Sequence, residues 1–355
     1  MILLLFTLIV IGIILEVISL KRDPNEVDAD GVLSTRVTEP GEPFNMQTVI
    51  TNKSFIPVSY LAIKEIFPPA SKLPADIIYR SKLSGSYTIK ICRLRARQRK
   101  KLIMETSIQK RGVHTFAGEY IEFGDFLGFR EIAREMNYEQ EIVVYPEKTE
   151  NRRLADTLAK FTGDVAAKRH LIRDPIITLG CREYTGREPM KEIHWLKSAQ
   201  RGELVVREFD YNRQISVSVI LSVEGLNLHD NEGLDECCSI ARSVCETLIG
   251  TGAVIKFFTN AKLTRKNMKT VWKCDVSAGN TGELLEGLGR VSAQFYGSME
   301  KLLDYALRES DFDTAFIVIL PANDTRGKEA EKRLKDNSSG DTVLLQGVNV
   351  YGEDV

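Results

Sequence analysis

The spacing of apolar residues changes about halfway along the chain, and this change constrains the fold more than any other feature. Up to residue 146, short apolar or alternating stretches are separated by turn-forming pairs such as Pro40-Gly41 and Pro68-Pro69. Short strands at this spacing predict an all-β sandwich, immunoglobulin-like in outline, at residues 30–146. From residue 211 onward, apolar strands alternate with stretches of helical periodicity, which predicts an α/β domain at 211–355 with a mainly parallel sheet.

The two parts of the chain yield a definite set of expected elements. In the first part, the expected strands are 32–39, 44–52, 58–67, 86–92, 99–109, 119–123 and 141–144. In the second part, the expected strands are 215–221, 253–259, 314–320 and 342–350, and the expected helices are 231–247, 297–308 and 325–334. A polar connector at 147–181 separates the two parts. Cys237, Cys238 and Cys245 fall on one expected helix, where we expect them to be small buried apolar residues.

The first twenty residues are almost entirely apolar, with Glu16 as their single charge. A helix of this length rises about 30 Å, which matches the hydrocarbon core of a bilayer. The stretch lacks the basic start and the small-x-small cleavage site of a signal peptide. We therefore expect a transmembrane helix at 1–20 and a single-pass location in the cell membrane. Lys21-Arg22 follows the helix, which favours the cytoplasmic side for the soluble domains.

Composition and motif searches argue against several functions. The chain has 355 residues, enough for about two domains. Its net charge of −1 gives no bias towards nucleic acid, so nucleic acid is not an expected partner. Its four histidines and six cysteines show no catalytic or metal-ligand spacing, and no Gly-x-x-x-x-Gly-Lys-Ser/Thr loop occurs. We therefore expect neither a cofactor nor catalytic residues.

Residues 182–210, REYTGREPMKEIHWLKSAQRGELVVREFD, are dense in charge and contain one of the two tryptophans of the chain. Their order resembles the core motif of the bacterial family called domain of unknown function 58. The matching residues are Arg182, Tyr184, Ile193, Trp195, Ser198, Ala199, Leu204, Val206 and Arg207. The chain departs from the family at Arg187-Glu188, where the family has Gly-Asp. It departs again at Lys191, where an arginine would offer a planar fork for carboxylates.

The resemblance implies a von Willebrand A-like domain after the motif. It also implies a partner, because such proteins are commonly encoded beside MoxR-type AAA+ ATPases and are thought to act with them in assembling or maturing other protein complexes. The expected function is therefore that of a membrane-anchored, non-enzymatic interaction or adaptor protein. The alternative is an enzyme of unknown class, in which Arg182, Glu188, Lys191 and His194 form a polar pocket within 182–210.

The motif residues allow two roles, partner binding and contact between domains. The residues concerned are Arg182, Tyr184, Glu188, Lys191, Ile193, Trp195, Ser198 and Arg207. Charges of both signs alternate through the motif, which suits an internal salt-bridge network as well as a docking face. We expect Trp195 to pack at the junction of the two domains, because an amphipathic ring suits a half-buried interface.

Von Willebrand A-like domains often bind a divalent cation after their first strand, through an Asp-x-Ser-x-Ser motif. The corresponding stretch here has Ser222 in place of the aspartate, and it offers Glu224 as a remaining carboxylate. A hard cation needs oxygen ligands with an anchoring carboxylate. We therefore expect this degenerate site at Ser222 and Glu224 to hold no metal.

A basic run at 93–101 places Arg93, Arg95, Arg97 and Arg99 at alternate positions. An extended backbone would project these four side chains to one face. Such a face suits an anionic partner, whether an acidic protein, lipid headgroups or nucleic acid. The other interpretation is a solvated hairpin tip.

Overall fold

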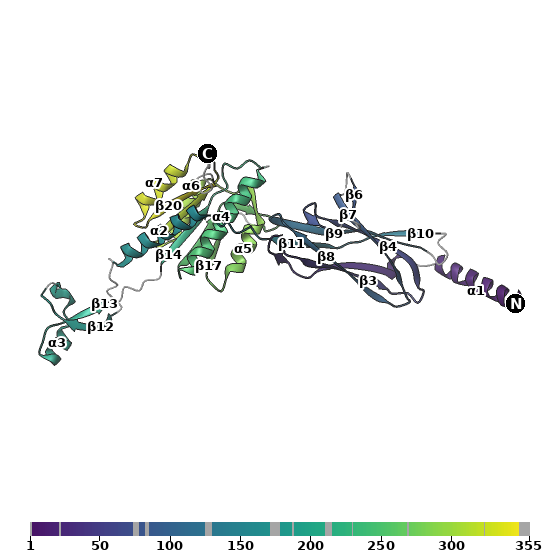
Figure 1. The fold of residues 1–355 in the computed structure, drawn as a ribbon, viewed down its shortest axis with the longest axis horizontal. Coiled ribbons are helices and arrows are strands. Elements are labelled where there is room, and N and C mark those ends of the chain that lie inside the picture. The colour runs from purple at the N-terminus through teal and green to yellow at the C-terminus, as the bar shows by residue number, and fades with distance from the viewer. Residues whose placement is uncertain are drawn as a thin grey trace. The chain divides into compact units, whose positions relative to one another are not determined.

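The protein forms two compact units, the first comprising residues 1–147 and 285–290 and the second comprising 148–284 and 291–355 (Figure 1). The computed structural model describes residues 2–20, 23–73, 78–81, 85–124, 130–170, 178–186, 188–209, 215–228, 230–267, 270–322 and 324–347.

The first unit begins with helix α1 (Ile2–Leu20) and a short 3-10 helix η1 (Pro24–Glu26), which lead into two β-sheets. The smaller sheet has the order β1-β3-β8-β5 and is antiparallel throughout. Its strands are β1 (Val27–Leu33), β3 (Phe44–Asn52), β8 (Arg99–Ile108) and β5 (Ser71–Lys72). The larger sheet has the order β2-β11-β9-β4-β7-β6, and β10 also pairs with β9. Its strands are β2 (Val37–Thr38), β11 (Glu139–Val144), β9 (Gly112–Gly124), β4 (Val58–Phe67), β7 (Gly85–Leu94), β6 (Ile78–Ser81) and β10 (Glu131–Glu135).

One hydrophobic core joins the two sheets into a sandwich, because alternate side chains of each sheet point towards the other. Phe44 of β3 meets Phe116 of β9 edge to face, with ring centroids 5.8 Å apart. A buried carboxylate, Glu65, interrupts this core and is held by Lys90 at 2.8 Å and by the Tyr138 hydroxyl at 3.2 Å. Burial, followed by the charge of Glu65, raises the pKa of Tyr138, so its hydroxyl stays a hydrogen-bond donor.

The first unit also includes the last residues of helix α5 (Thr281–Arg290). Arg290 forms an ion pair of 2.7 Å with Glu141 of β11, and the Arg111 guanidinium donates to the Leu288 carbonyl at 2.8 Å. Burial and these carboxylate contacts act in opposite senses on Arg290, and the net effect raises its pKa. The sandwich is therefore completed by residues that lie far along the chain from its strands.

The prediction of a transmembrane helix is wrong. A spanning helix needs about 20 consecutive apolar residues, and no helix within the described ranges is both long and apolar enough to cross a membrane. The same finding overturns the predicted single-pass location in the cell membrane.

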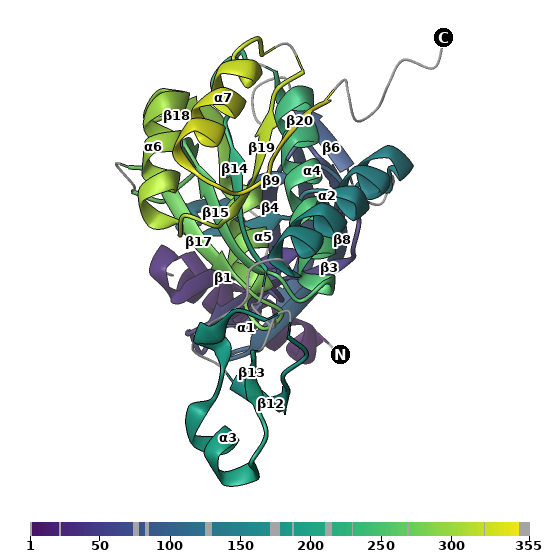
Figure 2. The same ribbon diagram turned by 90° about the vertical axis from the view of Figure 1, so that its left-hand side faces the viewer.

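The second unit is built around a five-stranded sheet of order β17-β15-β14-β19-β20. Its strands are β17 (Trp272–Val276), β15 (Val254–Thr259), β14 (Ser216–Leu221), β19 (Ala315–Leu320) and β20 (Thr342–Gln346). The helices packed around it are α2 (Arg152–His170), α4 (Asn231–Gly250), the first part of α5, α6 (Met299–Glu309) and α7 (Gly327–Asn337). A separate two-stranded sheet pairs β16 (Ala261–Leu263) with β18 (Val291–Phe295). Figure 2 shows α4 on one face of the sheet and α6 with α7 on the other.

The sheet core follows from long apolar strands and amphipathic helices. Every residue of β19 is buried, as expected for a central strand that helices cover on both faces. The prediction that Cys237, Cys238 and Cys245 are buried on one helix is confirmed, because all three are fully buried on α4. Burial raises the pKa of the Cys245 thiol, which keeps it protonated and inert.

The predicted mainly parallel, von Willebrand A-like sheet is corrected by the observed pairing. β14 runs parallel to β15 and β19, and β19 runs parallel to β20, but β17 runs antiparallel to β15. The sheet is therefore mixed, and the sheets of the first unit are antiparallel or mixed as well. A parallel neighbour needs a long crossover, usually a helix, and no helix lies between β15 and β17 in the described residues. β17 was not among the expected strands.

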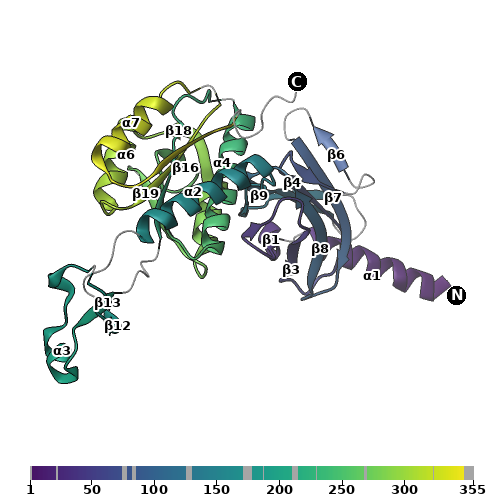
Figure 3. The same cartoon turned by 60° about the vertical axis from the view of Figure 1, so that its left-hand side comes forward.

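Residues 178–209 of the second unit form a small substructure, which we call the motif arm (Figure 3). It contains β12 (Thr178–Glu183), the 3-10 helix η2 (Met190–Glu192), α3 (Trp195–Arg201) and β13 (Val205–Phe209). Arg187, within this stretch, and Asp210, which follows it, lie outside the described residues.

Candidate functional site

The motif arm is held together by backbone pairing around β13. Arg182 of β12 lies opposite Val206 in an antiparallel ladder, and the Tyr184 N–H donates to the Leu204 carbonyl at 2.9 Å. On the other side, Ile193 forms an isolated bridge with Val206, and the His194 N–H donates to the Val205 carbonyl at 2.7 Å. Strand β13 therefore has partners along both edges.

A few buried side chains sit inside this frame. Ile193, Val205 and Val206 are each less than 5% exposed. The buried Ser198 hydroxyl accepts a hydrogen bond of 2.9 Å from the Val205 N–H. The chain needs a small hydroxyl there because α3 packs directly on the strand. Among the motif residues, Ile193 and Ser198 thus have positions that stabilise the arm itself.

Capping contacts define both ends of α3. The His194 ring accepts from the Lys197 N–H at 3.4 Å, and Gly202 ends the helix with a left-handed backbone at φ 75°. Glycine adopts this conformation without the steric cost of a Cβ. His194 is therefore a helix cap.

The polar residues Arg182 and Glu188 lie together. Their ion pair measures 2.6 Å, and Thr185 donates to the same carboxylate from its hydroxyl at 2.8 Å and its backbone N–H at 3.0 Å. The hydrogen bond from the Thr185 hydroxyl, with those from Arg182 and the backbone, lowers the pKa of Glu188 to about 2. A carboxylate held so firmly ionised is a poor proton carrier near neutral pH.

The arrangement does not assemble the polar pocket of the alternative enzyme. Arg182 and Glu188 meet, but the His194 ring caps α3, and Lys191 is exposed on η2 without a described ion-pair partner. Arg207 is likewise exposed on β13, and Tyr184 is partly buried beside the ladder. A catalytic site requires side chains that converge on one reacting atom, and these do not converge.

Four large apolar side chains of the arm point into solvent. Trp195 is 58% exposed, Leu196 68%, Met190 67% and Leu204 45%. We call these four residues the arm patch. The expectation that Trp195 packs at the junction of the two domains stays a prediction. The sequence alone gave no sign that Met190 and Leu196 would join Trp195 at the surface.

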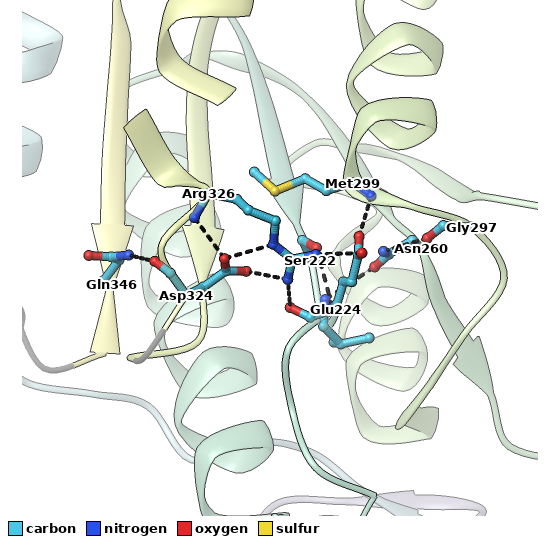
Figure 4. Close-up of polar contacts among 9 residues, drawn as sticks. Ser222, Glu224, Asn260, Gly297, Met299, Asp324, Arg326 and Gln346 are labelled. Atoms are coloured by element: carbon cyan, nitrogen blue, oxygen red, sulfur yellow. Dashed lines mark hydrogen bonds and ion pairs between the residues drawn. The ribbon is translucent and has the colours of Figure 1, made fainter. Parts of the chain in front are cut away.

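A second group of polar residues lies at the carboxyl end of β14, where the degenerate metal motif falls (Figure 4). Ser222 is fully buried there. The Glu224 carboxylate accepts from the Met299 N–H at the start of α6 and forms an ion pair with Arg326. Arg326 also donates to the Glu224 carbonyl at 2.7 Å and binds Asp324, whose side chain is 1% exposed, at 2.9 Å.

In this group the Arg326 guanidinium lies between two carboxylates and satisfies both. The hydrogen bond to Asp324 is the largest cause of the raised pKa of Arg326, and the charge of Glu224 adds to it. Within the described ranges, no three His, Cys, Asp or Glu side chains are grouped to hold a metal ion. Arg326 and Asp324 were not among the predicted site residues, although an Asp-x-Arg triplet shortly after a fully apolar strand could have indicated an internal ion pair.

A cavity of about 120 Å³ adjoins this ion-pair group and is lined by residues that include Leu303, Glu300 and Glu329. Small-molecule sites occupy roughly 300–1,000 Å³. The cavity is therefore too small for a typical cofactor or substrate.

Comparisons with known proteins give little further guidance. No protein-family model and no curated protein matches the sequence. Among solved structures, the chain is similar to a cohesin module of a Clostridium perfringens family 33 glycoside hydrolase, at 11% identity and a TM-score of 0.26, over 33% of this chain and 96% of that one.

Two further solved structures show the same level of similarity. One is a type II cohesin domain from the cellulosome of Acetivibrio cellulolyticus, at 12% identity and a TM-score of 0.26, over 33% of this chain and 94% of that one. The other is the CARDB domain of a Pyrococcus furiosus protein, at 12% identity and a TM-score of 0.22, over 33% of this chain and 89% of that one. TM-scores this low support no inference about function.

Proposed function

We propose that this chain is a non-enzymatic interaction protein of the kind found in the domain of unknown function 58 family, and that its motif arm docks a MoxR-type AAA+ ATPase. The observation that carries the proposal is the arm patch. Four large apolar side chains stand in solvent on a substructure whose polar motif residues Arg182, Glu188 and Ser198 are engaged within the arm.

The composition of the arm patch suits a protein interface. Tryptophan is among the residues that contribute most to binding when a partner buries them, and single truncations at such positions cost about 2 kcal/mol or more. Exposed cations lie on the same arm, and none of them forms an ion pair with a described residue; they are Lys191, Lys197, Arg201 and Arg207. Apolar centres with a charged, solvated rim are typical of specific interfaces.

The partner would supply the energy for any assembly reaction. The sequence contains no Gly-x-x-x-x-Gly-Lys-Ser/Thr loop with which to bind and hydrolyse a nucleotide. In the family that the motif resembles, the neighbouring MoxR-type ATPase provides that activity. The role proposed for this chain is therefore to present a client or a complex to the ATPase.

Binding of the full chain to a purified MoxR-type ATPase in the presence of ATP, measured by biolayer interferometry, tests the proposal. Trp195→Ala is expected to weaken binding about 30-fold, the equivalent of a 2 kcal/mol loss at an interface centre. Phe312→Ala is the matched control, because Phe312 is 71% exposed outside the arm. Equal binding by both variants would exclude the arm patch as the docking face, and no binding by the unmodified chain would exclude this class of partner.

A further inference from the structure

The basic run of the first unit connects β7 to β8, and we call residues 93–101 the basic tip. It contains six cations: Arg93, Arg95, Arg97, Arg99, Lys100 and Lys101. The predicted hairpin is wrong, because β7 pairs in the larger sheet and β8 in the smaller one. The basic tip therefore crosses from one sheet to the other at one end of the sandwich.

Hydrogen bonds from the neighbouring loop fix the backbone of the basic tip. The buried Asn52 donates its backbone N–H to the Gln98 carbonyl at 2.9 Å and its side-chain amide to the Arg95 carbonyl at 3.0 Å. The Arg97 N–H donates to the Ser54 carbonyl at 2.9 Å. The cations therefore project from a rigid support, which lowers the entropy lost when a ligand binds them.

The cations of the basic tip form no ion pair with any residue that the structure describes. Arg93 of β7 and Arg95, which directly follows β7, are exposed, whereas Cys92 and Leu94 are buried. On β8, Arg99 and Lys101 are exposed in the same alternating manner. Successive exposed cations on one strand are thus about 7 Å apart, twice the rise per residue of a strand.

Arg97, at the turn of the basic tip, has an unusual backbone. Its φ of 53° lies in the left-handed region, which residues other than glycine and asparagine rarely adopt. Its guanidinium stacks 4.1 Å from the ring centre of Phe55, which is itself 77% exposed. Residues with this backbone conformation cluster at active sites, ligand-binding positions and switch regions. Here it presents a cation and an aromatic ring together.

We infer that the basic tip is a docking surface for an acidic, extended segment of a protein partner. Carboxylates at alternate positions of an extended chain repeat at the same spacing of about 7 Å as the exposed cations Arg99 and Lys101 on β8. Arginine forks bind carboxylates in a bidentate manner, and four of the six cations are arginines. The exposed Phe55 ring adds an apolar contact beside them. This surface belongs to the sandwich and is independent of the docking role of the motif arm.

Fluorescence anisotropy with the full chain and two labelled eight-residue peptides tests this inference. One peptide alternates Glu and Ser, and the other has the same composition with its four glutamates contiguous. The alternating peptide is expected to bind more tightly. The double variant Arg93→Gln with Arg95→Gln is expected to weaken its binding about tenfold, from two lost exposed ion pairs. The control pair Lys328→Gln and Lys332→Gln removes the same charge from α7 and is expected to change nothing.

Folding is checked with a third variant. Arg97→Asn retains a residue that tolerates the left-handed backbone, so its melting temperature is expected to be unchanged or higher while peptide binding falls. Equal affinity for the two peptides would overturn the spacing argument, and unchanged binding by the Arg93/Arg95 variant would overturn the site. Tighter binding to phosphatidylserine vesicles or to single-stranded DNA of equal charge would assign the surface to those anions instead of a protein.

Discussion

The five-stranded sheet and the motif arm use apolar residues in opposite ways, although both belong to the second unit. In β19, all six residues are buried, and they hold the helices on both faces of the sheet. In the arm, three apolar residues, Ile193, Val205 and Val206, are buried, while the four larger residues of the arm patch are exposed. Apolar side chains stabilise the fold in the sheet, whereas the four exposed side chains of the arm patch contribute little to folding.

The arm therefore depends on polar contacts more than the sheet does. A two-stranded ribbon is at best marginally stable alone in water. The arm adds a capped helix, the Ser198 hydrogen bond to the backbone of β13 and the Glu188 ion pair with Arg182. These contacts keep the arm patch in place without burying it.

The largest effect is expected in the sheet. Phe316→Ala removes a fully buried ring from β19, and cavity formation should lower the free energy of unfolding of the second unit by about 3–5 kcal/mol. Urea denaturation followed by circular dichroism measures the change. A loss below about 1 kcal/mol would show that the sheet core repacks around the cavity. Buried apolar side chains would then stabilise the sheet no more than the exposed ones stabilise the arm.

A smaller effect is expected for the ion-pair group at the carboxyl end of β14. Arg326→Met leaves the buried Asp324 carboxylate and Glu224 without their cation, which should cost about 1–3 kcal/mol. Lys332→Met on α7 is the control, since Lys332 is exposed and has no ion pair with a described residue. If both variants unfold at the same urea concentration, the ion-pair group does not stabilise the sheet.

Acid should loosen the arm before the sheet. Because folding lowers the pKa of Glu188 from 4.5 to about 2, its contribution is fully present above pH 4.5 and is lost as pH falls towards 2. The protection factor of the Val205 amide against hydrogen exchange is therefore expected to fall over this window, whereas the protection factors of β19 amides stay constant. Glu188→Gln should abolish the difference in pH dependence, and an unchanged profile in that variant would assign the effect to another carboxyl group.

The smallest effect is expected from the arm patch. Trp195→Ala should change the free energy of unfolding by no more than about 0.5 kcal/mol, because the ring is exposed. The same denaturation assay applies. A loss above 1 kcal/mol would mean that Trp195 stabilises the fold, and the arm would then resemble the sheet.

Local patterns predicted much of the secondary structure. The strands at 44–52 and 58–67 and the buried cysteines of α4 are confirmed, because alternation and helical periodicity report burial directly. β17 runs antiparallel because no crossover helix follows β15 in the described residues. The stretch between them is only weakly apolar, so its sequence did not indicate a strand of this direction. Likewise, nothing in the run 93–101 indicates that its two strands pair in different sheets.

The candidate sites were harder to predict because they depend on contacts between distant residues. Glu224 and Arg326 are 102 positions apart in sequence and meet through the order of strands in the sheet. The resemblance of 182–210 to a known motif draws attention to this segment, but the sequence does not say which of its apolar residues are buried. Ile193 and Trp195 are two positions apart and have opposite environments.

The residues of α5 that group with the sandwich have a consequence for how the protein is made. Residues 285–290 group with the sandwich, and Arg290 among them pairs with Glu141. During synthesis these residues emerge 143 positions after Glu147 (290 − 147), a delay on the order of ten seconds at ordinary elongation rates. For that interval the nascent sandwich has its strands but lacks the contacts made by residues 285–290. A chaperone that acts on this protein would therefore meet the sandwich in this state before the second unit is fully synthesised.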